Sequence, residues 1–493
     1  MVLWDLVKDI SYETVQQGDD IPVTSLVTDN RKIEAGSVFV CIAGANFDGH
    51  SAAAEAAQKG AAAVIVEKDV DVPAGISVLR VDSTRRALAY LSAAYYGYPA
   101  RQMKVIGVTG TKGKTTTTYL IKSILENAGY KVGLIGTIEV IIGEEHIPAK
   151  NTTPESITIQ GYFRRMVDAG IQAVVMEVSS QALMMHRTDA IDFDLGIFTN
   201  IEPDHIGPGE HESFEHYISC KSLLFRQCRT GIVNGDDPHL EKILSGHTCG
   251  IETYGLSGHP DLLAENISLV HKPGCLGVEF DVSGLLSLHI SVPTPGRFSV
   301  YNALCALAVC RHFEIAPDAF QKALGQAKVK GRIEMIPISD RFTLMIDYAH
   351  NGMALRTLLE TLKEYEPKRL VCLFGCGGNR AKDRRYEMGE VSGEYADLSI
   401  ITSDNPRFED PQAIIDDIKT GIGKTDGKYV EIIDRKEAIA YAIHNAQDGD
   451  VIILAGKGHE DYQEIKGVKY PMDERVLIKE ILEEDGADTS MLC

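Results

Sequence analysis

The 493-residue sequence has no uninterrupted apolar run near the roughly 18 residues that a membrane span requires. The segment Met1–Ile10 carries Asp5, Lys8 and Asp9, so the apolar centre of a secretory signal peptide cannot form there. Cysteine is also sparse: its ten residues are scattered without a paired framework, which is typical of reduced cytosolic thiols. These absences predict a cytoplasmic protein without membrane insertion.

Basic residues are outnumbered, because 49 Lys and Arg stand against 70 Asp and Glu, giving a formal charge of −21. On average such a chain repels nucleic acid and anionic lipid, so neither is an expected partner. Any phosphate-bearing ligand must therefore be held by local features of the chain. Hydrophobic residues make up 44% of the sequence and charged residues 24%, which excludes a disordered chain, and the length suggests roughly three domains.

Two breaks in the sequence predict the domain boundaries. An Ala-rich helical pattern over Ser83–Tyr96 stops at Gly97-Tyr98-Pro99, where glycine and proline both oppose a longer helix. A second linker is predicted over Lys328–Arg332, after a helix at Pro317–Gln326. We therefore expect an N-terminal domain over 1–98, a central domain over 99–330 and a C-terminal domain over 331–493.

Apolar strand patterns alternate with helical patterns in the second and third of these domains, which predicts α/β folds with mostly parallel sheets. The predicted strands are Met103–Thr109, Ala173–Val178, Leu195–Thr199, Thr343–Ile346, Leu370–Phe374, Leu398–Thr402, Tyr429–Ile433 and Val451–Leu454. The third domain thus reads as a doubly wound, Rossmann-like one, and the glycine-rich loop Gly110–Thr116 of the central domain makes that domain a predicted P-loop-type ATPase domain. Ligands of such sheets bind beyond the carboxyl ends of the strands, which draws attention to the turns Gly110–Thr116, Gly375–Arg380 and Gly456–Glu460.

The strongest local motif is a phosphate-binding loop between a predicted strand and a helix that begins near Thr115. It reads Gly110-Thr111-Lys112-Gly113-Lys114-Thr115-Thr116. The glycines let backbone N–H groups turn toward phosphate oxygens, Lys114 supplies a charge to the outer phosphates, and the Thr115 hydroxyl is suited to magnesium. The motif departs from the general form in its glycine spacing, since Val108 stands at the first-glycine position.

Bound ATP and magnesium would need further ligands at neighbouring strand ends. Glu177 closes one predicted strand, and Asp204-His205 follows another that ends at Thr199-Asn200. Taken singly, such a carboxylate is usually a solvated cap and such a histidine an ordinary hydrogen-bonded one. Their positions relative to the phosphate loop make Glu177 and His205 candidates for the metal site.

In the third domain, Ser403-Asp404-Asn405-Pro406-Arg407 follows a predicted strand. Proline fixes the turn so that Asn405 and Arg407 can face one ligand, and the planar guanidinium suits a carboxylate. The turn Gly456–Glu460 carries Lys, His and Glu between its glycines. Either segment alone could be an ordinary capped turn.

Taken together and in this order, the motifs resemble those of the Mur ligase family, ATP-dependent enzymes that build the peptide stem of peptidoglycan. The family's phosphate loop has the short glycine spacing found here, and the resemblance extends over essentially the whole chain. The other matching segments are Asn151-Thr152-Thr153-Pro154, Glu177-Val178-Ser179-Ser180, Thr199-Asn200, Asp204-His205, Tyr301-Asn302-Ala303-Leu304, Gly331-Arg332 and Asp347-Tyr348-Ala349-His350.

Within the family, Asp404-Asn405-Pro406-Arg407 resembles the motif of members that add meso-2,6-diaminopimelate to UDP-N-acetylmuramoyl-L-alanyl-D-glutamate (UDP-MurNAc-L-Ala-D-Glu). Diaminopimelate ends in a carboxylate that a guanidinium can pair with, whereas lysine offers only an ammonium. The resemblance implies an acyl-phosphate mechanism in cytoplasmic peptidoglycan precursor synthesis, with ATP and Mg²⁺, in a protein we expect to be a monomer. The amino-acid site it implies consists of Arg380, Asp404, Asn405, Pro406, Arg407, Gly456 and Glu460.

The resemblance also implies roles for residues in the other domains. Lys221 falls where the family carries a carbamylated lysine, an anionic magnesium ligand, although composition alone predicts a solvated helix residue. The implied catalytic residues are Lys114, His205, Lys221, Arg332 and Asp347; the metal ligands are Thr115, Glu177, His205 and Lys221; and the ATP contacts are Gly110 to Thr116, Asn302, Arg332, Asp347 and His350. For UDP-MurNAc-dipeptide they are Asn30, Asn151, Thr152, Thr153, Ser179 and Arg187, with weaker uridine-end candidates at Ser25, Thr28–Arg31 and Asn46–His50. Gln181 and Met185 depart from the family pattern in the muramoyl subsite.

Several alternatives stay open at this point. The lysine-adding ligase of the same family is disfavoured by Arg407, and a folylpolyglutamate synthetase by the full domain ahead of the phosphate loop. A P-loop switch that hydrolyses ATP to change shape would need no amino-acid pocket. A small-molecule kinase would instead release a stable phosphorylated product.

Overall fold

The computed structural model describes residues 1–44, 47–207, 209–272 and 274–486. By internal packing the chain forms two compact units, one of Met1–Asp261 with Cys305–Ile315, the other of Leu262–Leu304 with Ala316–Cys493. Among the described residues, no helix has both the length and the apolar character needed to cross a bilayer. The α/β class predicted from the sequence is confirmed, while the boundaries 1–98, 99–330 and 331–493 remain a prediction.

The first unit begins with a five-stranded sheet in the order β1-β5-β4-β3-β2, parallel except for β1. Its strands are β1 (Glu13–Gln16), β2 (Ser25–Val27), β3 (Ser37–Val40), β4 (Ala63–Val66) and β5 (Ser77–Arg80). Its helices are α1 (Leu3–Leu6), α2 (Ala53–Gln58) and α3 (Thr84–Tyr95), with 3₁₀ turns η1 (Asn30–Lys32) and η2 (Gly49–Ala52). Helix α3 matches its predicted range within one residue, because the Ser83 hydroxyl caps its start and Gly97 and Tyr98 adopt positive φ after its end.

The same unit continues with strands in the order β13-β12-β11-β6-β10-β7-β8-β9, of which β6, β7 and β10 to β13 run parallel. Their bounds are β6 (Lys104–Thr109), β7 (Val132–Ile135), β8 (Glu139–Ile142), β9 (Glu145–Pro148), β10 (Ala173–Glu177), β11 (Phe193–Phe198), β12 (Cys228–Asn234) and β13 (Gly250–Gly255). The helices are α4 (Lys114–Asn127), α5 (Ser156–Asp168), α6 (Ser180–Met184), α7 (Phe214–Ser222) and α8 (Leu240–Ile243), with η3 (Pro99–Gln102) and η4 (Leu223–Arg226). The predicted strands at 103–109, 173–178 and 195–199 are therefore present.

The second unit starts with the antiparallel strands β14 (Leu262–Lys272), β15 (Cys275–Gly284) and β16 (Leu288–Val292). They are followed by α9 (Arg297–Cys310), whose residues from Cys305 onward belong to the first unit, and by α10 (Pro317–Gln326). A six-stranded sheet follows in the order β17-β18-β22-β19-β20-β21, parallel except for β17. Its strands are β17 (Glu334–Ile336), β18 (Thr343–Asp347), β19 (Arg369–Phe374), β20 (Leu398–Ile401), β21 (Tyr429–Glu431) and β22 (Asp450–Ala455). An antiparallel hairpin of β23 (Tyr462–Ile465) and β24 (Val468–Pro471) follows β22 in the chain.

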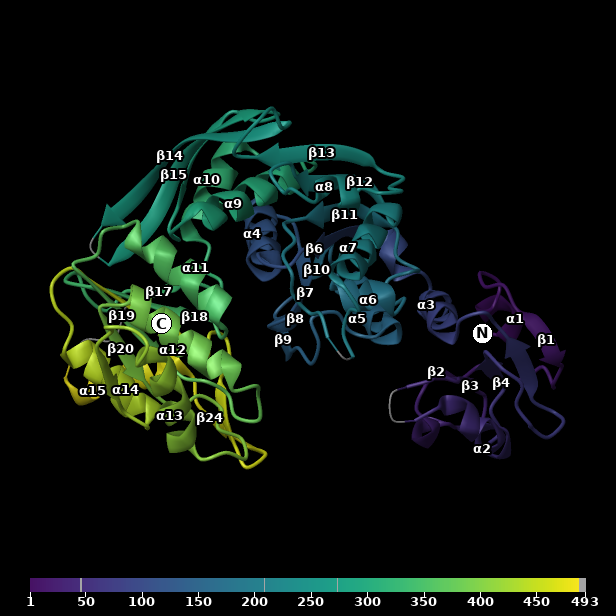
Figure 1. Cartoon of the computed structure of the whole chain (residues 1–493). Helices are drawn as coiled ribbons and strands as arrows, with labels where there is room; N and C mark the ends of the chain where they lie inside the picture. The colour runs from purple at the N-terminus through teal and green to yellow at the C-terminus, as the bar shows by residue number, and fades with distance from the viewer. Residues whose placement is uncertain (45–46, 208, 273, 487–493) are drawn as a thin grey trace. The chain divides into compact units, whose positions relative to one another are not determined.

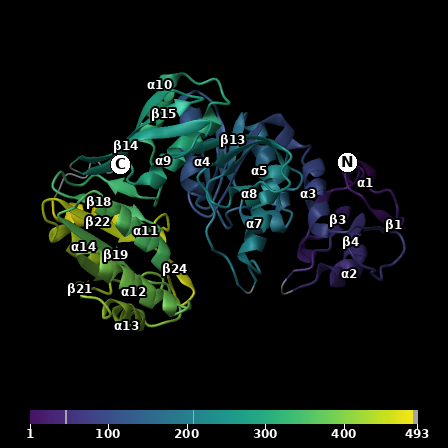
Figure 2. The ribbon, with the colours of Figure 1, turned by 45° about the horizontal axis from the view of Figure 1, so that its top comes forward.

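Helices cover this six-stranded sheet on both faces (Figure 1, Figure 2). On β22, Val451 and Ile453 pack in one apolar cluster with α11 (Gly352–Lys363), α12 (Asp383–Tyr395) and α13 (Pro411–Ile422). Ile452 and Leu454 pack in the other cluster with α14 (Arg435–His444) and α15 (Glu474–Glu484). Because successive strand residues point to opposite faces, a continuous apolar run is the expected pattern of such a doubly wound sheet.

Candidate active site

The phosphate loop lies where β6 passes into α4. Gly110 and Gly113 have φ of +148° and +83°, and a Cβ on Gly110 would lie 1.9 Å from the Thr199 hydroxyl oxygen. Glycine is therefore required at Gly110 on both conformational and steric grounds. Lys114 begins α4 and its Nζ donates to the carbonyls of Gly110 (2.9 Å) and Thr111 (3.0 Å), so its charge is held over the loop.

The segment after β11 braces this loop. Asn200 Oδ1 accepts from the Lys112 N–H at 2.9 Å, and the Thr199 hydroxyl donates to the Lys112 carbonyl at 2.7 Å. Thr199-Asn200 was noted in the sequence as a motif without a role. The structure gives both residues a positioning function, reaching the loop from the neighbouring strand.

The predicted metal ligands Thr115 and Glu177 lie together. The Thr115 hydroxyl donates to Glu177 Oε1 at 3.0 Å, and Glu177 is 1% exposed at the end of β10. Glu177 also accepts from the backbone N–H and the hydroxyl of Thr137 at 2.8 and 3.0 Å. A hydroxyl and a buried carboxylate beside a phosphate loop are oxygen donors that fit Mg²⁺. Thr137 was missed from the sequence, where nothing distinguishes it from other threonines.

His205 is placed differently from the other predicted metal ligands. It lies on an exposed loop with φ of +54°, and its Nδ1 is 3.2 Å from Glu210 Oε1. It nevertheless lines the same cavity as Lys114. His205 is thus near the site by location, while its role as a ligand remains a prediction.

Lys221 is buried, not solvated, which corrects the expectation from composition. It is 1% exposed on α7, its Nζ donates to the Gly110 carbonyl at 2.8 Å, and it lies 4.5 Å from the centre of the Tyr217 ring. Burial, and then the nearby charge of Lys114, holds the pKa of Lys221 well below its ordinary value. A buried amine with a lowered pKa spends more time neutral, and the neutral amine is the form that can add carbon dioxide to give a carbamate.

A cavity of about 390 Å³ brings Lys114 and His205 together with residues predicted for the muramoyl dipeptide. Those residues are Asn151, Thr152, Thr153, Ser179 and Arg187. Further lining comes from Thr137, Lys150, Ser180, Gln181, Met184, Glu210 and His211. Gln181, one of the two departures from the family pattern, therefore faces this space. Lys150 was missed, although its charge directly precedes the Asn151–Pro154 motif.

Arg187 is fixed in this cavity by its neighbours. It donates from Nη1 to the Thr153 carbonyl at 2.9 Å and pairs with Glu155 at 2.6 Å. Its Nε is buried and has no partner among the described residues. An unpaired buried N–H is costly unless a ligand accepts from it, so Arg187 is suited to a carboxylate or phosphate of the substrate.

Among the N-terminal candidates, Ser25 lies on β2 of the five-stranded sheet and Asn30 on the 3₁₀ turn η1 that follows β2 in the chain. Asn30 begins η1 and donates from Nδ2 to Glu55 at 3.0 Å, and the Ser25 hydroxyl lies 2.8 Å from that of Ser37. Asn30 is absent from the lining of the 390 Å³ cavity. Asn46 lies outside the described residues. A role for this group in holding the uridine end remains a prediction.

In the second unit, Arg332 and Asp347 lie beside the Gly456–Glu460 turn. Asp347 accepts from the N–H groups of Ile333 and Ala349 at 2.9 and 2.8 Å, and burial raises its pKa. The Arg332 guanidinium lies 4.6 Å from the centre of the Tyr348 ring, and a Cβ on Gly331 would clash with Gly458 at 2.1 Å. His350 is exposed and bonds the Tyr348 carbonyl, and Asn302 is buried on α9.

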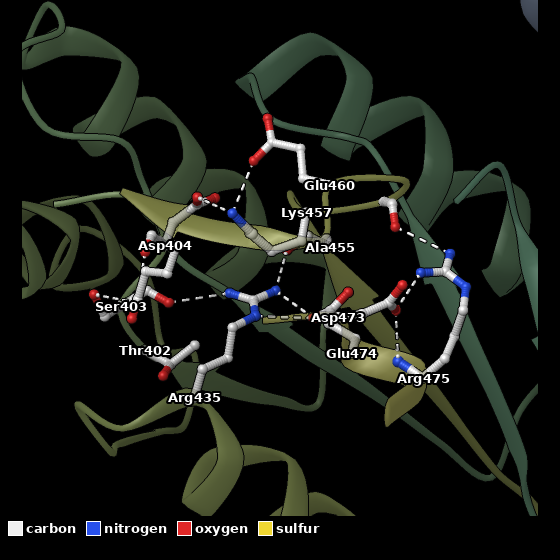
Figure 3. Close-up of polar contacts among 12 residues, drawn as sticks. Thr402, Ser403, Asp404, Arg435, Ala455, Lys457, Glu460, Asp473, Glu474 and Arg475 are labelled. Atoms are coloured by element: carbon white, nitrogen blue, oxygen red, sulfur yellow. Dashed lines mark hydrogen bonds and ion pairs between the residues drawn. The ribbon is translucent and has the colours of Figure 1, made fainter. Parts of the chain in front are cut away.

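The amino-acid candidates converge on Lys457, whose side chain is fully buried. Its Nζ donates to Asn405 Oδ1 at 3.0 Å and to Glu460 Oε2 at 2.8 Å, while Asn405 Nδ2 also donates to Glu460 Oε2 at 2.9 Å. Asp404 lies 3.6 Å from the same ammonium, as Figure 3 shows. Lys457 thereby fixes the orientation of three predicted ligand-binding side chains.

Arg380 ends the Gly375–Arg380 turn, and the Arg407 side chain contacts that turn. Arg407 has φ of +54° and donates from Nε to Glu464 at 3.2 Å and from Nη1 to the Gly378 carbonyl at 2.9 Å. Its Nη2 has no bond among the described residues. A Cβ on Gly377 would lie 4.0 Å from both arginine side chains, and Arg380 is exposed. The Arg407 guanidinium and the aliphatic part of the Arg380 side chain therefore both lie close to Gly377.

A buried ion pair lies beneath the start of the Asp404–Arg407 loop and of the Gly456–Glu460 turn (Figure 3). Arg435 and Glu474 are 2% and 0% exposed and pair at 2.7 Å. Arg435 also donates to the carbonyls of Ser403 and Ala455 at 3.2 and 3.0 Å, which are the residues just ahead of Asp404 and Gly456. This pair was missed from the sequence because its members are 39 positions apart.

Comparisons with known proteins agree with this geometry. The model described as Mur ligase middle domain matches residues 108–310, that of the glutamate ligase domain matches 331–458, and that of the Mur ligase family catalytic domain matches 22–96. A protein of Caldanaerobacter subterraneus subsp. tengcongensis is 43% identical over 98% of this chain and 99% of its own length, and one of Clostridium perfringens is 40% identical over 98% and 100%. Both are named UDP-N-acetylmuramoyl-L-alanyl-D-glutamate--2,6-diaminopimelate ligase.

Solved structures of similar proteins share this fold. A structure of an enzyme with that same name has a TM-score of 0.71 and 28% identity, covering 94% of this chain and 95% of its own. A Mycobacterium tuberculosis folylpolyglutamate synthase complexed with ADP and AMPPCP has a TM-score of 0.59 at 17% identity and covers 76% of this chain and 92% of its own. The latter likeness extends to the fold alone.

Removing one partner of the buried pair should destabilise the C-terminal sheet. Arg435→Met leaves Glu474 buried without a counter-charge, which is expected to cost about 3–5 kcal/mol. The matched control is Lys436→Met on the same helix, whose exposed pairs with Glu480 and Glu484 should be worth at most about 1 kcal/mol. Urea denaturation measures the free energy of unfolding of the two variants. An equal loss of stability in both would show that the buried pair does not support the Asp404–Arg407 and Gly456–Glu460 loops.

Proposed function

The chain belongs to the Mur ligase family, and we propose that it is the ATP-dependent ligase that adds meso-2,6-diaminopimelate to UDP-MurNAc-L-Ala-D-Glu. The observation that carries this proposal is the agreement between full-length relatives of that name and the Asp404–Arg407 loop. We propose a cytoplasmic enzyme of peptidoglycan precursor synthesis that acts as a monomer on small-molecule substrates.

The reaction proposed has two steps. The glutamate side-chain carboxylate of the UDP-linked substrate attacks the γ-phosphorus of ATP, which forms an acyl phosphate and releases ADP. An amine of diaminopimelate then attacks the acyl carbon, the amide bond forms, and inorganic phosphate leaves with the proton passing to solvent or a nearby base. The products are the UDP-linked tripeptide, ADP and phosphate.

The residues of the first unit serve the phosphoryl transfer in this proposal. Backbone N–H groups of the Gly110–Thr116 loop and the Lys114 ammonium hold the phosphates, while Arg187 and its neighbours in the cavity hold the muramoyl dipeptide. Thr115, Glu177, His205 and a carbamylated Lys221 would hold Mg²⁺. The ion would neutralise charge on the phosphates when bound.

The residues of the second unit serve the acceptor and the nucleotide. Asn302, Arg332, Asp347 and His350 are proposed to contact ATP. Asn405 and Glu460, fixed by Lys457, offer acceptors to an ammonium of diaminopimelate. Arg407 and Arg380 are proposed to bind the far carboxylate, with Glu464 and the Gly378 carbonyl orienting the Arg407 guanidinium.

The second candidate is the lysine-adding ligase of the same family. It would share every step of this chemistry, and only the acceptor pocket separates the two. Lysine has no far carboxylate, so it would leave the Nη2 of the half-buried Arg407 guanidinium, whose Nε already donates to Glu464, without an acceptor. The pocket geometry therefore favours diaminopimelate.

Arg407→Asn tests the specificity. Loss of a charged hydrogen-bond partner is worth about 1.5–3 kcal/mol, so kcat/KM for diaminopimelate should fall about 10- to 100-fold while the KM for ATP stays unchanged. The control is Arg356→Asn, since Arg356 pairs with Glu394 and Tyr395 on the helices α11 and α12. An unchanged preference for diaminopimelate over lysine in the Arg407 variant would overturn this account of specificity.

Lys221→Met tests the carbamate, because methionine fills a similar volume and cannot add carbon dioxide. We expect activity to fall at least about 100-fold with no response to bicarbonate, since loss of an anionic metal ligand removes several kcal/mol of charge stabilisation. The chain with its native Lys221 should lose activity when carbon dioxide is stripped from the buffer and regain it when bicarbonate is added. Lys242→Met, at an exposed lysine, is the control. Full activity of the Lys221 variant would reject a metal-ligand role.

A further inference from the structure

Three side chains near the substrate cavity form a cluster that the proposed reaction does not use. His216 and Cys220 lie four residues apart on α7 and so share one helix face, and His211 reaches them from the preceding loop. One ligand atom of each residue lies within 4.8 Å of the others. The rings of His211 and His216 meet edge to face at 5.2 Å.

His211 has the environment of a metal-binding histidine. It is 2% exposed, and its Nδ1 is buried with no partner among the described residues. Its Nε2 lies 2.8 Å from the Ser180 hydroxyl. Histidines that bind a metal through one ring nitrogen usually hold the other in such a hydrogen bond, which fixes the tautomer and the ring. Without a ligand the buried Nδ1 has a desolvation cost that no described residue offsets by a hydrogen bond.

The other two members are available as ligands. Among the described residues, the His216 ring makes one hydrogen bond, in which its Nδ1 accepts from the backbone N–H of the exposed Glu212 at 3.3 Å, so a metal would displace little there. Cys220 is a free, buried thiol. Neither group belongs to the oxygen-donor pair Thr115 and Glu177.

We propose that His211, His216 and Cys220 form a binding site for a transition-metal ion of borderline softness, such as Zn²⁺. Imidazole and thiolate ligands select such ions over Mg²⁺, and three protein ligands leave a fourth tetrahedral position for water. Binding releases the Cys220 thiol proton to solvent. Because His211 also lines the cavity that contains Lys114, the metal would sit at the edge of the substrate site.

Cobalt(II) is the probe, added to the full-length reduced protein in the presence of excess Mg²⁺ and without nucleotide. A tetrahedral site with one thiolate should give an intense near-ultraviolet sulfur-to-cobalt band, together with visible bands, at one equivalent of metal. Zn²⁺ should abolish these bands by competition. Cys220→Ala should remove the near-ultraviolet band, and His216→Gln, at a half-buried position, should weaken cobalt binding at least tenfold.

Two controls make the result specific. His239→Gln replaces another histidine whose buried Nδ1 makes no hydrogen bond to the described residues and lies 3.5 Å from Asp237 Oδ1, and should leave the spectrum unchanged. Cys228 and Cys249 are free thiols that interact with each other and are a rival source of a cobalt–thiolate band. Cys228→Ala removes one of them and should also leave the spectrum unchanged. Loss of the band in Cys228→Ala, its persistence in Cys220→Ala, or no band at all with the native chain would each overturn the proposal.

Discussion

The register of three parallel strands is the constraint on which the first unit's site depends. Glu177 on β10 is paired with Val108 on β6, and Phe198 on β11 with Thr109 on β6. The strands therefore end level with one another, so the carboxylate, the phosphate loop and Thr199 emerge at one edge. A shift of one residue would turn Glu177 to the opposite face and remove the partner of Thr115. The missing Cβ of Gly110 completes this arrangement, since Thr199 occupies that space.

In the second unit, buried charged side chains position the candidate site. The Arg435–Glu474 pair holds the carbonyls at the bases of two loops, and Lys457 holds the side chains at their tips. Separating the partners of a buried ion pair is costly, so Arg435, Glu474 and Lys457 each have a strong preference for one geometry. A pocket for an amino acid with two ammonium and two carboxylate groups requires such fixed counter-charges. The site residues are thus positioned by strand register in the first unit and by buried ion pairs in the second.

The sequence predicted much of this because the relevant signals are local. Glycine turns, strand patterns and caps placed the phosphate loop, the Asp404–Arg407 turn and helices such as Thr84–Tyr95 within a residue or two. Burial and long-range pairing are not local. Lys221 looked like a surface lysine until its helix was packed against the phosphate loop, and Arg435 carries no sign of Glu474 in its neighbourhood. Thr137 is identified only by its hydrogen bonds to Glu177, and Lys150, although it adjoins Asn151 in the sequence, only by its place in the cavity lining.

The central claim is that ATP cleavage is coupled to amide formation with diaminopimelate. The most direct measurement is phosphate release from ATP with UDP-MurNAc-L-Ala-D-Glu present, with meso-diaminopimelate, L-lysine or no acceptor added, and with the product identified by mass. The account predicts release that requires diaminopimelate and yields the UDP-linked tripeptide. Release that requires lysine instead would contradict the account of Arg407, and release indifferent to every acceptor would contradict ligase chemistry itself.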